Sequence, residues 1–502
     1  MSNVFDGLLA TLSFAPLVAM VLGVAVGMVV GAIPGLSSTM AISLAIPFTF
    51  GLEPLTALGL LAGIHNGASQ GCAIPAILLR IPGSTGAIAT CWDGYPMAQQ
   101  GHAGAAIRLS ASSSAVGGML SALSLLLLAP PLAIAALSFG PPEIFWLNIF
   151  GLTAVIALIG DDPLKGIVSA CIGLLIGTVG MDAVTGENRF VFGVLELSAG
   201  IPELVVIVGM FSLPPTFDLV RRGALADFGS LRKLGGKLKG IWTILGVWKV
   251  WLRSSIIGII LGIIPGSSGG SVFIAYTEAR RVSKSPETFG KGNPEGLAAA
   301  ESVNNADNAA AMIPALTLGI PGSSVAALML GALLVQGLTP GPQLFRDNPT
   351  IVYGYSWQMF ITALLLLPLG GIVASRLFVQ ALRIPPGLLM PIIVALTVVG
   401  TFAYQNTMFN VHLMLVFAAF GLIIERFGFP ITPVIIGLVL GVSAEANLRI
   451  SVLLSRGDPL TFLFTRPISL IIIAVTIALI AFTLVSKKRE RARQKENVAA
   501  SA

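Results

Sequence analysis

Short polar turns inside apolar sequence are the residues best placed to bind a ligand in this chain. Each turn is a Pro-Gly pair followed by small hydroxyl side chains. Proline removes a backbone donor and glycine permits unusual dihedral angles, so the pair opens a helix. The helix that starts after it offers free N–H groups and the positive end of its dipole, which attract a carboxylate. The residues concerned are Pro34, Gly35, Ser37, Ser38 and Thr39; Gly83 and Ser84 after Pro82; Gly266, Ser267 and Ser268 after Pro265; and Gly322, Ser323 and Ser324 after Pro321.

The four turns form two matched pairs. Asn66 precedes its downstream turn by the same number of residues as Asn305 precedes the counterpart. The upstream turns are offset differently, because the second copy carries an additional polar insert. Two copies of such breaks in apolar sequence are the pattern of a transporter built from internal repeats. We therefore predict that Asn66 and Asn305 bind substrate together with the turns.

The composition places the chain in a lipid bilayer. Of its 502 residues, 55% are hydrophobic and 10% are charged, whereas a soluble domain carries about 25% charged residues. Long apolar stretches recur throughout, and we predict an all-α polytopic membrane protein with about 10–12 transmembrane helices. The net charge of +6 reflects a few basic loops, so nucleic acid is not an expected partner. Three cysteines in or beside apolar sequence indicate neither a disulfide framework nor a metal site, and no cofactor is expected.

Basic residues set the predicted orientation. The tail (486–502) and the loop around residues 221–239 are rich in Lys and Arg, and we expect both in the cytoplasm. The second copy leaves this side near Ser254 and returns at Arg280, which indicates a re-entrant Pro-Gly hairpin about half a bilayer deep. The first copy has acidic flanks and should enter from the opposite face, with the N-terminus in the periplasm. Two tilted membrane-spanning helices are the alternative to such a hairpin, because they would give the same hydropathy pattern.

Opposed hairpins predict an inverted internal repeat with a shared central site. We assign one integral membrane transport domain to residues 1–485, with repeat 1 at 12–200 and repeat 2 at 241–445. The basic tail follows it.

The segment from Glu301 to Asn308 is unusually polar for an apolar stretch. Intramembrane polar residues are costly and are usually functional. One interpretation is an unwound helix whose side-chain and backbone oxygens bind substrate and a cation; the other is a loop at the membrane surface. Under the first, Asn304 and Asn305 contact substrate, while Asp307, Asn308 and Glu301 hold the coupling ion, Asp307 being the best candidate. No metal is expected beyond a transported Na⁺.

Two further features have competing interpretations. Arg80 lies in apolar sequence, so it either reaches an interface or meets an anion. The segment from Trp92 to Pro96 is predicted as a turn. Residues 266–270 fit a nucleophile elbow, but this motif needs a soluble strand–turn–helix context and a His/acid pair, and neither is expected here. The sequence therefore indicates no enzyme.

Longer motifs resemble a known family. The chain is similar, over about residues 20–445, to the large membrane subunit of the tripartite tricarboxylate transporters (TctA-like). The motifs are Phe289-Gly290-Lys291-Gly292-Asn293-Pro294-Glu295-Gly296, Glu301 with Asn304-Asn305-Ala306, the stretches 314–322 and 337–342, Pro34-Gly35-Leu36-Ser37, and Asp93-Gly94-Tyr95-Pro96-Met97. Ser267-Ser268, Ala300 and Arg80 depart from the family pattern, in which Arg80 is replaced by Asn.

The resemblance implies a subunit of the bacterial inner membrane that imports di- or tricarboxylates by symport with H⁺ or Na⁺. It also implies two partners, a small integral membrane subunit and a periplasmic solute-binding protein. Arg80 would favour a different or more highly charged anion. Two alternatives stay open: a stand-alone ion-coupled organic anion symporter, and a membrane scaffold subunit that transports nothing.

Overall fold

Helices make up nearly all of the structure, a computed structural model that describes residues 2–33, 36–159, 162–182, 185–222, 246–264, 270–373, 386–455, 457–481 and 483. Within these ranges the one sheet is a short antiparallel pair, β1 (Gly180–Met181) and β2 (Asn188–Arg189). The prediction of an all-α polytopic membrane protein is confirmed. The basic tail (486–502) and most of the basic loop lie outside the described residues.

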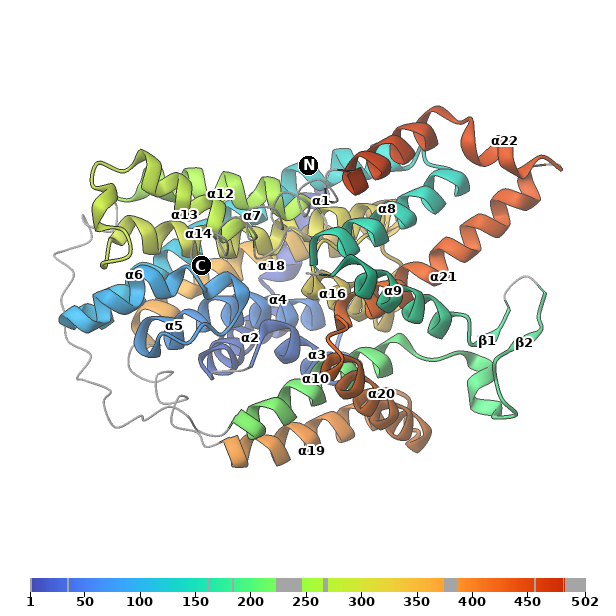
Figure 1. Ribbon diagram of the computed structural model, residues 1–502, viewed down its shortest axis with the longest axis horizontal. Coiled ribbons are helices and arrows are strands. Elements are labelled where there is room, and N and C mark those ends of the chain that lie inside the picture. The colour runs from blue at the N-terminus through green and yellow to red at the C-terminus, as the bar shows by residue number, and fades with distance from the viewer. Residues whose placement is uncertain are drawn as a thin grey trace, which may run out of the picture. The chain divides into compact units, whose positions relative to one another are not determined.

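The chain forms two compact units, residues 1–134 with 202–423 and residues 135–201 with 424–502. The first unit holds both copies of the polar motif. Its helices (Figure 1) are α1 (Ser2–Thr11), α2 (Phe14–Ala32), α3 (Ser38–Thr49), α4 (Pro54–Gly71), α5 (Ala73–Leu79), η1 (Thr85–Ala87), α6 (Thr90–Met97), η2 (Ala98–His102), α7 (Ala103–Ala136), α10 (Glu203–Arg222), α12 (Trp248–Ile263), α13 (Ser271–Val282), η5 (Pro286–Thr288), α14 (Pro294–Ala310), α15 (Met312–Leu318), α16 (Ser324–Val335), α17 (Pro342–Asp347), α18 (Pro349–Leu366), η6 (Leu367–Val373), α19 (Pro386–Gln405) and α20 (Met408–Arg426).

Helix length divides the apolar segments into two classes. Six are long and apolar enough to cross a bilayer: Phe14–Ala32, Thr90–Ala136, Pro349–Gly371, Leu388–Gln405, Met408–Arg426 and Ile431–Leu454. Others, such as Ser38–Thr49 and Ser324–Val335, have 12 residues each, or about half a span. The predicted 10–12 crossings therefore require several of these shorter helices to be counted.

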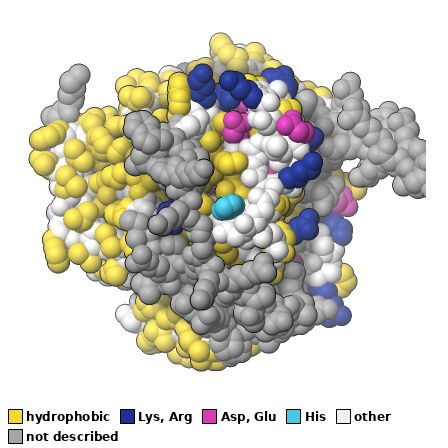
Figure 2. All heavy atoms as spheres, turned by 90° about the vertical axis from the view of Figure 1, so that its left-hand side faces the viewer, with side chains coloured by type: hydrophobic (Ala, Val, Ile, Leu, Met, Phe, Trp, Pro, Cys, Tyr) yellow, Lys and Arg dark blue, Asp and Glu magenta, His cyan; other side chains and the backbone are white. Residues whose placement is uncertain are grey.

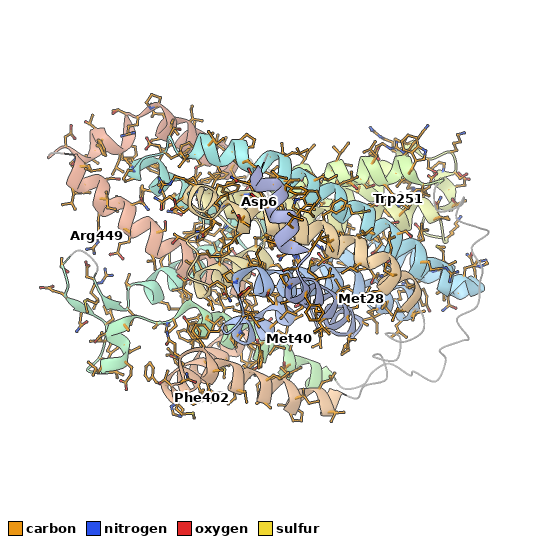
Figure 3. The ribbon with its side chains drawn as sticks, turned by 180° about the vertical axis from the view of Figure 1, so that it is seen from behind. Asp6, Met28, Met40, Trp251, Phe402 and Arg449 are labelled. Atoms are coloured by element: carbon orange, nitrogen blue, oxygen red, sulfur yellow. The ribbon has the colours of Figure 1, made fainter. Side chains whose placement is uncertain are left out.

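Helices α2 and α4 pack with their backbones in direct contact. Glycines recur at every fourth position on both, at 23, 27 and 31 on α2 and at 59, 63, 67 and 71 on α4. A Cβ added at Gly63 would lie 2.6 Å from the Met20 carbonyl oxygen, and one added at Gly67 would overlap the Val24 carbonyl. Small residues at this spacing let membrane helices approach closely. This contact fixes where α4 lies. Figure 3 labels Met28 on α2, which is fully buried.

The second copy builds the equivalent contact between α12 and α14. A Cβ added at Gly258 would lie 2.8 Å from the Ala306 side chain, and one added at Gly262 would lie 2.8 Å from Ala310. Small residues therefore line both helices of this pair too. In both copies the two helices approach closely through small residues, which are mainly glycines in the α2–α4 pair and glycines with alanines in the α12–α14 pair.

The long helix of each copy lies against the broken helix of the other. Helix α18 packs on α4, where Gln358 Nε2 donates to the Leu55 carbonyl at 2.6 Å. Helix α7 packs on α14, where Ser121 Oγ accepts from Ala310 N–H at 2.9 Å. The α12 side chain Trp251 (labelled in Figure 3) also donates to Ser113 Oγ on α7 at 2.8 Å. The two copies are therefore interlocked and form one core.

Helices α12 and α13 run side by side in opposite directions (Figure 1). Arg253, near the start of α12, pairs with Glu278, near the end of α13, at 3.4 Å. Basic side chains gather on this face (Figure 2), and Arg280, Arg281 and Lys284 at the end of α13 are exposed. The arrangement agrees with the hairpin expected for the second copy. Whether its tip stays inside the bilayer remains a prediction.

The second unit is a smaller helical bundle in which buried carboxylates pair with partly exposed arginines. It comprises α8 (Pro141–Ile159), α9 (Pro163–Gly177), η3 (Leu195–Ala199), α21 (Ile431–Leu454), α22 (Pro459–Phe464) and a helix at Pro467–Ala481. Arg466 pairs with Glu143, whose side chain is 1% exposed. Arg449 (labelled in Figure 3) pairs with Asp182 at 2.7 Å. The described part of this unit holds none of the predicted site residues.

The glycine contact gives a direct test of the fold. We expect Gly67→Ala to destabilise the protein by about 1–3 kcal/mol, because the new methyl group meets a backbone carbonyl that has no room to move. Thermal unfolding in detergent measures the effect. Gly51→Ala is the matched control, since nothing lies within 4 Å of a Cβ added there. Equal melting temperatures for the two variants would show that the helices separate without cost.

Candidate functional site

The two downstream turns have the same local geometry. Both broken helices end at a left-handed residue, Arg80 with φ 59° and Gly319 with φ 72°. Four residues later the chain is extended, with φ/ψ of −150°/167° at Ser84 and −150°/168° at Ser323. The matched spacing in the sequence therefore corresponds to matched backbone structure.

Each turn folds back on the junction within its own broken helix. A Cβ added at Gly83 would lie 2.9 Å from Cys72 Sγ, the residue that joins α4 to α5. A Cβ added at Gly322 would lie 3.3 Å from the carbonyl oxygen of Ala311, which joins α14 to α15. Both glycines permit close approach, which holds the following serine beside the end of α4 or α14.

Serines begin the helices that follow the breaks. Ser37 caps α3, its hydroxyl accepting from Met40 N–H at 3.2 Å, and Ser323 caps α16 in the same way from Ala326 at 3.1 Å. Ser84 precedes the single turn η1 and makes no side-chain cap. The predicted ligand residues Ser37, Ser38, Thr39, Ser84, Ser323 and Ser324 are all partly exposed. Pro34, Gly35, Gly266, Ser267 and Ser268 lie outside the described residues.

The two broken helices meet at a buried amide–hydroxyl cluster. Asn308 Nδ2 donates to Asn66 Oδ1 at 3.0 Å and to Ser69 Oγ at 3.1 Å. Ser69 and Asn308 occupy equivalent positions in the two copies, as their equal distances from Asn66 and Asn305 show. Contact between equivalent residues is expected where two copies are related by a two-fold axis. The cluster thus joins the two copies at matching positions of their sequences.

Asn66 and Asn305 differ in their surroundings. Asn66 Nδ2 also donates to Thr362 Oγ1 at 2.9 Å and to the Met359 carbonyl at 3.2 Å. Asn305 is fully buried, and neither its amide nitrogen nor its amide oxygen bonds to any described residue. Buried polar groups without partners are rare in folded proteins. Asn66 therefore uses its amide nitrogen to bond α18. The side-chain amide of Asn305 has no described partner and can still form hydrogen bonds.

Asn304 connects the cluster to the first downstream turn. Its Nδ2 donates to the Ser69 carbonyl at 3.5 Å. Its Oδ1 lies so close to Gly86 that a Cβ added there would overlap it. The side chain is partly exposed, so it joins the accessible serines to the buried amides beneath them.

The polar segment is helical, so both interpretations of it are corrected. Residues 301–308 lie inside the continuous helix α14, which Asn293 caps and Pro294 starts. The prediction of an unwound helix is wrong because residues 301–308 contain no Gly or Pro, alanines flank them in α14, and side chains such as Glu301 and Asn308 bond to other helices. The surface-loop alternative is wrong because most of these side chains are buried.

Glu301 is fully buried among hydroxyl groups. Ser110 Oγ and Ser114 Oγ each donate to its Oε2 at 3.0 Å, and Thr90 Oγ1 donates to Oε1. The hydroxyls come from α6 and α7, in the first copy, and Glu301 from the second. Asp307 lies elsewhere on α14, facing Gly262 of α12. The two predicted coupling-ion carboxyls thus occupy separate places, and Asn308 belongs to the amide cluster.

Arg80 is exposed and lies over the ring of Tyr95, with its guanidinium carbon 5.9 Å from the centroid. It is therefore not a buried cation. Its left-handed conformation is unfavourable for a residue with a Cβ, and the second copy has glycine at the same point. The structure describes no contact between Arg80 and the amide cluster.

Several functional candidates were missed from the sequence. Ser69 is three residues beyond Asn66, one helical turn away, which is a readable signal. The sequence carries no comparable signal for Thr90, Ser110 and Ser114, because each looks like an ordinary small residue in an apolar helix. Asp93 was placed in a predicted turn that is in fact helix α6.

Asp93 is a buried structural carboxylate. Its Oδ1 accepts from the backbone N–H groups of Gly290, Gly292 and Asn293, at 2.9, 2.9 and 2.7 Å, and its Oδ2 accepts from Tyr276 at 2.7 Å. These bonds anchor the loop before α14 to α6. Both Asp93 oxygens therefore accept hydrogen bonds from within the protein.

The strained Arg80 backbone gives the second prediction. Arg80→Gly should stabilise the protein by about 1 kcal/mol, because glycine adopts the left-handed conformation without steric cost. Gly319→Ala is the matched opposite change and should lower stability by a similar amount. Thermal unfolding of both variants measures this. A less stable Arg80→Gly protein would show that the contact with Tyr95 outweighs the strain.

The comparisons with known proteins agree with this architecture. Residues 17–436 match the family model described as "Tripartite tricarboxylate transporter TctA family". An Agrobacterium vitis protein, the "Uncharacterized 52.8 kDa protein in TAR-I ttuC' 3'region", is 37% identical over 507 residues, which cover 98% of this chain and 97% of that protein. A second A. vitis protein, the "Uncharacterized protein in TAR-II ttuC' 3'region", is 37% identical over 244 residues, 47% of this chain and 98% of that protein. No solved structure matches.

The family model covers most of the chain, including both copies of the polar motif, and one relative matches nearly end to end. The resemblance read from the motifs is confirmed. The chain belongs to the tripartite tricarboxylate transporter TctA family and is a membrane transporter subunit.

Proposed function

We propose that this chain is the large membrane subunit of a binding-protein-dependent secondary transporter that imports di- or tricarboxylates. A periplasmic solute-binding protein delivers the substrate, and a small integral membrane subunit completes the complex in the bacterial inner membrane. Uptake is driven by symport of H⁺ or Na⁺. The family to which the chain belongs supports this reading, because its description names a tripartite transporter of tricarboxylates.

The contact between Ser69 and Asn308 carries the proposal. It joins the broken helix of one copy to that of the other, and the serines at the turns of both copies, Ser37, Ser84 and Ser323, are partly exposed. Binding sites of inverted-repeat transporters lie at such a repeat interface, with helix N-termini directed at anionic groups. We place the substrate carboxylates between these turn serines, Asn304 and the amide cluster. Arg80, which is exposed and precedes Ser84 by four residues, would attract a second carboxylate.

The amide cluster is uncharged, and this supports coupling to a cation. Amides and hydroxyls bind a carboxylate without neutralising it, and carrying an unbalanced anion through a bilayer is unfavourable. A co-transported cation offsets that charge. Glu301 and Asp307, both on α14, are the acidic residues that we assign to it. Movement of the interlocked repeats then exposes the site alternately to the two sides of the membrane.

Transport by inside-negative vesicles tests this function. The vesicles contain the chain with its small membrane partner, and they receive labelled acetate, succinate or citrate with and without the binding protein. Uptake of succinate or citrate only with the binding protein is the expected result. Equal uptake without it would show a stand-alone symporter. No uptake of any of them would contradict the proposal and favour a scaffold subunit.

The amide cluster gives the third prediction. Asn305→Ala and Asn308→Ala should each reduce carboxylate uptake by about tenfold or more, since a hydrogen bond to a charged group contributes about 1.5–3 kcal/mol. Asn447→Ala in α21 is the matched control, because that side chain bonds only within its own helix. The amount of folded protein is measured in parallel by size-exclusion chromatography. Unchanged uptake by both site variants would remove these residues from the site.

A further inference from the structure

We propose that the coupled cation is a proton and that Glu301 is the residue that carries it. This inference rests on the proposed transport function and names the ion and its carrier, which the function alone leaves open.

Glu301 is the point where three helices from both copies meet. Its carboxyl group lies on α14, and its hydrogen-bond partners are Thr90 on α6 and Ser110 and Ser114 on α7. The side chain is completely inaccessible. A carboxyl group at the contact between two repeats is positioned so that its charge affects how the repeats hold together.

No described cationic side chain compensates a charge on Glu301. The ion pairs of the described residues do not include it. The titratable groups that face it are two thiols, those of Cys72 at the junction of α4 and α5 and Cys91 on α6. The neighbouring α12 meets α14 through Gly258 and Gly262, and the α13 side chain Tyr276 is bonded to Asp93.

A buried carboxylate without a cation is unfavourable, so the group is stable when it holds a proton. The surrounding hydroxyls suit both forms. Each can donate to a carboxylate, and each can rotate to accept from a carboxylic acid. Ser110, Ser114 and Thr90 touch the carboxyl oxygens directly, so protonation needs no added space. A sodium ion, by contrast, would have to separate these bonded oxygens.

The proposed step is simple in chemical terms. A proton from the outer side binds the Glu301 carboxylate, one O–H bond forms, and the neutral acid crosses with the bound anion. The same bond breaks when the proton leaves to the inner side. The proton thus enters with the substrate and offsets one negative charge. No other bond changes.

Glu301→Gln separates this role from a structural one. Glutamine has the same shape and keeps hydrogen bonds to the hydroxyls, but it cannot release or bind the proton. We expect this variant, in vesicles with the partner subunit and binding protein, to keep exchange of labelled for unlabelled citrate or succinate. Accumulation driven by an inward proton gradient should fall to that of vesicles lacking the chain. Glu295→Gln, in the first turn of the same helix, should retain both activities.

Removing hydroxyl donors provides a second, independent readout. The pair Ser110→Ala and Ser114→Ala takes away groups that favour the ionised form, so the pH of half-maximal uptake should rise, by about one pH unit for the loss of about 1.4 kcal/mol. A structural role alone would lower the rate without moving the pH profile. The pH profile of this double variant tests whether Glu301 carries the proton even if Glu301→Gln fails to fold.

The outcomes separate this inference from the function on which it rests. Wild-type vesicles that take up none of the carboxylates contradict both. Uptake driven by sodium and unaffected by Glu301→Gln contradicts the proton carrier and leaves the transport function intact. The same holds if Asp307→Asn abolishes gradient-driven accumulation while Glu301→Gln does not. Proton entry with substrate in wild type, lost in Glu301→Gln, supports it.

Discussion

Direct contact between the backbones of α2 and α4 is the constraint on which the rest of this structure depends. In a bilayer no hydrophobic force drives helices together, so close packing has to supply the attraction. The glycine series on both helices removes every side chain that would separate them. Because α4 is held there, its polar face at Asn66 and Ser69 has a fixed position against α14. A bulkier pair of helices would displace the amide cluster.

Neutral and ionisable groups of the polar core lie in different places and have different roles. Amides where the two copies meet provide hydrogen bonds without charge, and the carboxyl of Glu301 lies in its own shell of hydroxyls. Asp93, a second buried carboxyl, is occupied by backbone N–H groups and serves the structure alone. Buried acids on neighbouring helices thus have different roles, which follow from whether their partners are backbone donors or rotatable hydroxyls.

The sequence predicted local features better than contacts between distant segments. Proline, glycine and serine act on the backbone within a few residues, so the caps at Ser37 and Ser323 and the matched turns could be anticipated. The helical state of residues 301–308 could not be anticipated, since Glu301 and Asn308 bond to Asn66, Ser69 and the α7 serines, which are distant in the sequence. For the same reason Thr90 and Ser110 carried no recognisable signal. Arg80 looked buried by hydropathy, yet the turn exposes it.

Ser69 and Asn308 face each other as equivalent members of the two copies, yet they are different residues. In an assembly of two identical chains, a residue at the two-fold axis meets its own copy, so the contact is the same from both sides. Two copies within one chain are free of that restriction. A hydroxyl on one side and an amide on the other make this contact asymmetric, so a ligand bound there would meet different groups from the two copies.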